Sequence, residues 1–69
     1  MSELDVARIK AEALREAAEV FEELAERIRY TTYPASRWYS EYTRSAEDRE
    51  ATAKLLRDRA TRLETEAAA

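Results

Sequence analysis

A single proline, Pro34, interrupts a sequence that otherwise consists almost entirely of residues that favour helices. The chain of 69 residues contains no glycine, and alanine, glutamate and arginine dominate its composition. A residue that precedes proline is pushed out of the α region, and the β-branched pair Thr31 and Thr32 also weakens a helix at this point. One continuous helix is therefore excluded, and we expect a helical segment on either side of the interruption.

The first segment, residues 3–30, has the periodicity of an amphipathic helix. Apolar residues recur at spacings of three and four, which places them along one side of a helix. This stripe consists of Leu14, Ala17, Phe21, Leu24 and Ile28. Ala11, Ala18 and Ala25 repeat every seven residues beside it. The apolar arc is wider than the ~100° stripe of a simple surface helix, so we expect this helix to contact more than one neighbour.

The last segment, residues 45–67, shows a narrower apolar stripe. Ser45 is a good N-cap residue, and Asp48 follows three positions later, as in a capping box. The stripe consists of Ala53, Leu56, Ala60, Leu63 and Ala67. Elsewhere on this helix, charges of alternating sign stand at every fourth position, namely at Glu50, Lys54, Asp58, Arg62 and Glu66. Alternating charge at this spacing is typical of a solvent-exposed helix face.

These patterns predict an all-α fold with a single domain over residues 1–69. Two long helices form a hairpin, and residues 34–43 connect them as a short, aromatic-rich helix or loop. The large apolar residues are expected to build the core, namely Leu14, Phe21, Leu24, Ile28, Leu56 and Leu63. A hairpin of this size is marginally stable alone, and the chain has no cysteine for a disulfide. We therefore expect it to associate with itself, as a dimer or higher oligomer, into a helix bundle.

Five of the six aromatic residues lie between positions 30 and 42, in the connection and its flanks. Their rings have two possible roles: they cover the end of the bundle as a lid, or they form a surface that binds another protein. Trp, Tyr and Arg are enriched at interaction hot spots, and arginines stand among these rings. The residues that we expect to bind a partner are Tyr33, Arg37, Trp38, Tyr39, Tyr42 and Arg44.

The residue types that most catalytic and metal sites need are missing from this chain. It has no histidine to act as a base or metal ligand, and no cysteine to act as a nucleophile or to bind zinc. Without glycine, it also lacks the phosphate-binding loops of P-loop and dinucleotide-binding proteins. We therefore expect a protein that is not an enzyme and that uses no cofactor and no metal.

Charge and hydropathy bear on the remaining partners. No run of ~20 apolar residues could span a membrane, and the acidic N-terminus lacks the apolar region of a signal peptide, so we expect a cytoplasmic location and no membrane partner. The net charge of −3 argues against nucleic acid, because phosphate neutralisation dominates that affinity. Arginines beside aromatic rings still leave one alternative function, a ligand-binding protein that holds a nucleotide or single-stranded nucleic acid with this segment.

Two stretches, residues 13–19 and 55–64, resemble a known group of proteins. The first reads ALREAAE and the second LLRDRATRLE. They are similar to LREAA-like and WLRDRADRLE-like stretches of small helical proteins encoded by phages of high-GC actinobacteria. Arginine outnumbers lysine ten to two, which agrees with a GC-rich genome and argues against a designed sequence. The resemblance implies an accessory phage protein that binds a host or virion protein, and it transfers no catalytic residue.

Overall fold

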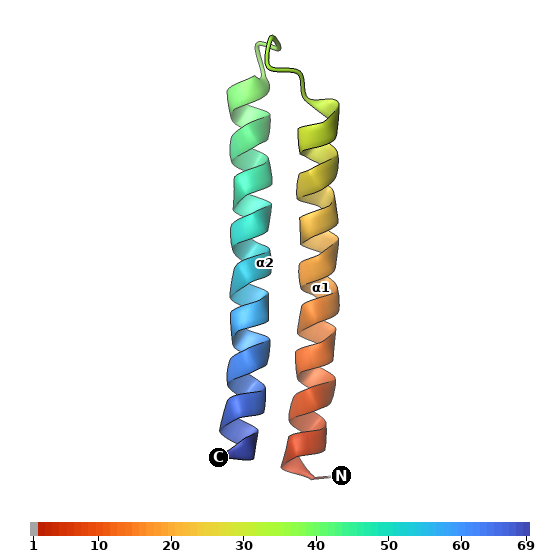
Figure 1. Cartoon of the computed structure of the whole chain (residues 1–69), viewed down its shortest axis with the longest axis vertical. Helices are drawn as coiled ribbons and strands as arrows, with labels where there is room; N and C mark the ends of the chain where they lie inside the picture. Colours follow the sequence, from red (N-terminus) through yellow and green to blue (C-terminus); the bar gives the residue numbers. More distant parts are fainter. Residues whose placement is uncertain (1) are drawn as a thin grey trace.

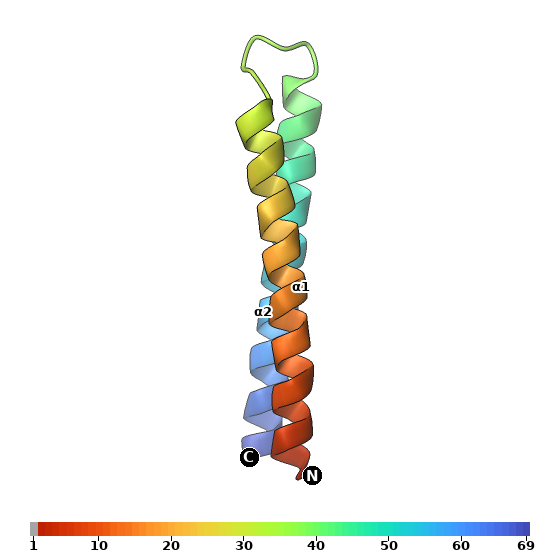
Figure 2. The same ribbon diagram turned by 90° about the vertical axis from the view of Figure 1, so that its right-hand side faces the viewer.

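The computed structural model describes residues 2–69, and these form an antiparallel pair of helices. Helix α1 spans Glu3–Thr31 and helix α2 spans Tyr39–Ala68 (Figure 1). The helices lie side by side along their whole length, and the two termini lie at the same end (Figure 1). The view turned by 90° shows that they cross at a shallow angle (Figure 2). The predicted all-α hairpin is thus confirmed for these residues.

A capping box that the sequence analysis did not identify starts α1. The backbone amide of Asp5 donates to the hydroxyl of Ser2 at 3.1 Å, and the amide of Ser2 donates to the carboxylate of Asp5 at 3.4 Å. These bonds satisfy two amides that a helix leaves unpaired at its start. At the other end of α1, the hydroxyl of Thr32 donates to the carbonyl of Ile28 at 2.6 Å. The helix therefore ends one residue beyond the 30 expected from the sequence.

The connection is shorter than the sequence suggests, because α2 begins at Tyr39 rather than at Ser45. The amide of Ser36 donates to the carbonyl of Tyr33 at 2.9 Å, which closes a β-turn with Pro34 in its second position. No described residue has a positive φ, as expected for a type I turn. The hydroxyl of Ser36 then accepts from the amide of Trp38 at 3.2 Å. The amide of Tyr39 also donates to the carbonyl of Ser36 at 3.1 Å, and α2 begins there, with Trp38 as an N-cap residue that makes no side-chain capping bond. No separate helix therefore spans residues 34–43.

Ser45 consequently lies inside α2 and is not its N-cap. A guanidinium nitrogen of Arg49 donates to the carbonyl of Ser45 at 3.2 Å and also to its hydroxyl. Arg49 lies one turn further along the same helix, so both contacts are local. The spacing of Ser45 and Asp48 predicted a helix start at Ser45, and this prediction is wrong. The helix starts earlier, after the turn at Pro34.

The buried core consists of alanine. Within residues 2–69, the buried apolar side chains are Ala7, Ala11, Ala18, Ala25, Ala46, Ala53 and Ala60. No large side chain of this part of the chain is fully buried. The predicted core of Leu14, Phe21, Leu24, Ile28, Leu56 and Leu63 is therefore wrong for the single chain. Methyl groups let two helices approach closely, so the alanines lie where α1 and α2 touch and the larger residues lie beside them. We call this row of buried alanines the contact line.

Candidate functional site

Each helix carries the same order of residues around its buried alanines. Positions three residues after an alanine are turned to one side of the contact line, and positions four residues after it are turned to the other. Because the helices are antiparallel, equivalent positions of α1 and α2 lie on the same side of the hairpin. The hairpin consequently has two different broad faces. One carries the residues three positions after each buried alanine (the three-residue offset), and the other carries the residues four positions after it (the four-residue offset).

The face at the four-residue offset is closed by ion pairs between α1 and α2. The described residues supply three of them: Arg15 with Glu64, Glu22 with Arg57, and Arg29 with Glu50. Both sets of positions are spaced by seven, like the alanines. In the central pair, Nε of Arg57 donates to one carboxylate oxygen of Glu22 at 3.1 Å and a second guanidinium nitrogen donates to the other oxygen. We call this side the ion-pair face.

The ion pairs shift the pKa of three residues, namely Glu22, Arg29 and Arg57. The hydrogen bond from Arg57, helped by the attraction of its charge, lowers the pKa of Glu22 from its ordinary value of 4.5, although partial burial acts in the opposite direction. The same hydrogen bond raises the pKa of Arg57. The hydrogen bond to Glu50 likewise raises the pKa of Arg29. These shifts favour the charged forms of Glu22, Arg29 and Arg57.

The opposite side, which we call the apolar face, carries the large hydrophobic residues. The three-residue offset places there Leu14, Phe21, Ile28, Leu56 and Leu63, all of them half-buried, and also the charged residues Lys10 and Arg49. Beyond them, α1 continues with the half-buried Ala17 and with Leu24, which is 37% exposed. An open cavity of about 400 Å³ lies on this face between Leu14 of α1 and Leu63 of α2, and Lys10 and Arg59 also line it. The side chains of the apolar face are therefore covered only in part.

The outer edges of the apolar face differ between the two helices. Six residues after its buried alanines, α1 carries Ala13, Ala17, Leu24 and Thr31, whereas α2 carries Thr52, Arg59 and Glu66. The α1 edge is therefore apolar up to Thr31 at its end, and the α2 edge is polar. Val20, the next apolar residue around α1, is 55% exposed.

The surface area of the chain is large for its mass. A compact monomer of 8.0 kDa exposes roughly 4,500 Å², whereas this chain exposes 5529 Å². The radius of gyration is 15.9 Å, against about 11 Å expected for a compact domain of this length. The excess of about 1,000 Å² is comparable to the ≈ 800 Å² that each partner contributes to a standard protein interface.

The aromatic residues gather at the closed end of the hairpin, which we call the aromatic tip. Tyr33 is 76% exposed and Tyr30 is 88% exposed. Trp38, Tyr39 and Tyr42 are 45%, 40% and 48% exposed. These rings therefore do not form a buried lid in the single chain, and they present apolar area to solvent.

The structure brings together some of the predicted partner-binding residues. The guanidinium of Arg37 lies 4.7 Å from the ring centre of Trp38, in a cation–π contact. Tyr39 and Tyr42 line one pocket. Tyr33 and Arg44 are exposed and take part in neither arrangement.

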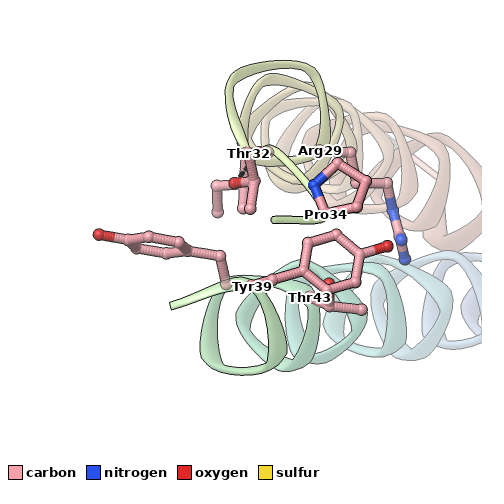
Figure 3. A pocket seen from close by; sticks show the side chains of 7 residues that line it. Arg29, Thr32, Pro34, Tyr39 and Thr43 are labelled. Atoms are coloured by element: carbon pink, nitrogen blue, oxygen red, sulfur yellow. Dashed lines mark hydrogen bonds between the residues drawn. The ribbon is translucent and has the colours of Figure 1, made fainter. Parts of the chain in front are cut away.

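The pocket at the tip has a volume of about 210 Å³. Figure 3 shows it between the end of α1 with Arg29 and Thr32, the connection with Pro34, and the start of α2 with Tyr39 and Thr43. Two of its polar groups are already engaged, because Arg29 pairs with Glu50 and Thr32 bonds to a backbone carbonyl. Pockets for drug-sized ligands have volumes of ≈ 300–1,000 Å³, so this pocket suits a single side chain better than a nucleotide.

Among residues 2–69, no group of three or more acidic side chains lies close enough together to hold a metal ion. Neither α1 nor α2 is long and apolar enough to cross a membrane.

Sequence reasoning missed the alanine contact line of α2 and the ion pairs beside it. The available signal was the spacing of seven at Ala46, Ala53 and Ala60, which matches the spacing of Ala11, Ala18 and Ala25 in α1. A repeat of seven on both sides of a turn is typical of an antiparallel coiled coil. Comparisons with protein families, with curated proteins and with solved structures found nothing that matches this chain.

Proposed function

We propose that this chain is a non-catalytic helical module for protein–protein interaction. The observation that supports this best is the aromatic tip, where five exposed rings and Arg37 gather at one end of the hairpin. Trp, Tyr and Arg dominate interaction hot spots because they bury large areas and still form hydrogen bonds. In this proposal, Trp38, Tyr39 and Tyr42 contact the partner together with Tyr33, Arg37 and Arg44.

The proposal extends to self-association and to the setting in which the chain acts. The half-exposed apolar face and the large surface area support association of the chain with itself. The resemblance to small phage proteins supports a phage accessory factor that acts in the cytoplasm of a bacterial host. Its partner is then a host or virion protein, reached through the aromatic tip.

Affinity capture from a bacterial lysate tests the role of the aromatic tip. The double variant Trp38→Ala/Tyr39→Ala removes two of its rings and is compared with the wild type. The wild type and the control variant Leu55→Ala, altered on an exposed position far from the tip, should retain one protein in stoichiometric amount. The double variant should lose it while keeping its circular-dichroism helicity. Equal capture by the double variant, or loss of capture by Leu55→Ala, would contradict the proposal.

A second candidate function is binding of a nucleotide or a single strand by the same segment. Arg37 stacked on Trp38 is the observation that favours it, because bases stack on such rings. The ultraviolet spectrum of the purified chain separates the two functions. A ratio skewed toward 260 nm would favour the nucleic-acid ligand over a protein partner.

A further inference from the structure

We propose that a second copy of the chain covers the apolar face, with α1 packed antiparallel on α1 of that copy and the aromatic tips at opposite ends. This inference rests on the self-association proposed above and adds its geometry. It starts from area: the surplus of about 1,000 Å² per chain is what an interface between two such hairpins would remove from solvent.

A second copy suits this face because the face is mostly apolar along both helices, with Lys10 and Arg49 as its charged positions at the three-residue offset. Stacking two hairpins face to face turns Leu14, Phe21 and Ile28 inward in each copy, together with Leu56 and Leu63. The residues that sequence patterns assigned to the core then form the core of a four-helix bundle. The ion-pair faces lie on the outside, where their charges remain hydrated.

Two-fold symmetry allows two such stacks. An axis parallel to the helices places α1 on α2 of the other copy, and both tips then lie at the same end. An axis perpendicular to the helices places α1 on α1 and α2 on α2, and the tips then lie at opposite ends.

The unequal edges of the apolar face select the second stack. With α1 on α2, the edge that contains Leu24 meets the edge that contains Arg59 and Glu66, which buries charge against hydrocarbon. With α1 on α1, the edge of Ala17 and Leu24 meets its own copy. The polar edges of α2 then meet each other at the rim of the dimer and stay accessible to water. The apolar edge of α1 therefore meets another apolar edge only when the two-fold axis is perpendicular to the helices.

Single-cysteine spin labels test this geometry, because the natural chain has no cysteine and each label is unique. Ala35→Cys places the label at the tip, and Lys54→Cys places it near the middle of α2. For labels at Lys54, we expect a distance below about 40 Å in either stack. For labels at Ala35, the proposed stack predicts about 50 Å or more, since the hairpin is 53 Å long. The parallel axis predicts less than about 30 Å.

The outcomes at the two positions separate the inference from the proposal beneath it. No dipolar coupling at Lys54 means no dimer, and both the geometry and the self-association fail. A short distance at both positions overturns the antiparallel stack and leaves self-association in place. A short distance at Lys54 with a long one at Ala35 supports the inference.

Matched substitutions test the edge that the inference assigns to the interface. Leu24→Lys should weaken dimerisation by at least about tenfold, because each copy would lose a leucine contact where the two α1 edges meet and would place a charge there instead. Leu55→Lys makes the same chemical change on the outer side of α2, where the residue is 69% exposed, and should leave dimerisation unchanged. Sedimentation over a concentration series measures association whether or not the separated chains stay folded. Equal effects of the two variants would overturn the assignment.

Discussion

Ala53 is 1% exposed, and it lies on the contact line between α1 and α2. The side chain contributes little apolar area of its own. Its importance comes from its size, because a single methyl group lets the backbone of α1 come close. Ala51, two residues earlier in the same helix, is exposed. The pair thus offers the same residue type in two opposite environments.

We expect Ala53→Leu to destabilise the hairpin by about 1–3 kcal/mol, because the added carbons must push the helices apart. Ala51→Leu should change stability by less than about 0.5 kcal/mol, since its side chain extends into solvent. Urea unfolding followed by circular dichroism measures both variants against the wild type. If Ala53→Leu proved as stable as Ala51→Leu, the helices would not be in contact at this alanine.

The central ion pair, between Glu22 and Arg57, should make the hairpin sensitive to acid. The pKa of Glu22 is lowered in the folded state by Arg57. A depressed carboxyl pKa stabilises the fold above the ordinary glutamate value of 4.5, and this contribution is lost as the pH falls through the folded value. We therefore expect Glu22→Gln to flatten the loss of stability below about pH 5.

Glu23→Gln is the matched control for this prediction. The part of the chain that the structure describes places no ion-pair partner beside Glu23, which is exposed one position further along α1. Thermal unfolding between pH 3 and pH 7 should show the wild-type pH dependence for Glu23→Gln and a weaker one for Glu22→Gln. A pH profile of Glu22→Gln that coincided with the wild type would mean that the pair with Arg57 does not form in solution.

The helices themselves were predictable from the sequence, whereas their starts and their contact line were only partly so. The apolar period of 3.6 identified both segments, and Pro34 located the break. The start of α2 was missed because two backbone turns, from Tyr33 to Ser36 and from Ser36 to Tyr39, lead the chain into the helix before Ser45 is reached, and the apolar pattern does not show them. The contact line was misplaced because hydrophobicity ranks Leu and Phe above Ala, while close helix packing selects for small size.

The aromatic tip could be identified from composition alone, but its arrangement could not. The cluster of rings between residues 30 and 42 is visible in the sequence. The contact between Arg37 and Trp38, and the shared pocket of Tyr39 and Tyr42, depend on the β-turn at Pro34 and on the early start of α2. Local turn geometry of this kind decides where side chains point, and spacing rules do not capture it.

The whole molecule is an elongated rod, 53 × 15 × 10 Å along its Cα atoms, and a rod of two helices has little interior. We expect its stability to depend on assembly, so the midpoint of thermal unfolding should rise with protein concentration. Scans of circular dichroism at concentrations from about 1 µM to 1 mM would measure this shift. A midpoint that stayed constant over this range would identify the hairpin as a monomer that is stable alone.

The alanine core also has a calorimetric consequence. The heat capacity change of unfolding grows with the apolar area that becomes exposed. A contact line of methyl groups contains little such area, so separating α1 from α2 within one chain changes the heat capacity by only a small amount. Most of the heat capacity change in this system should therefore accompany the covering of Leu14, Phe21 and their neighbours. An isolated hairpin would have an unusually flat stability curve, with marginal stability spread over a wide range of temperature.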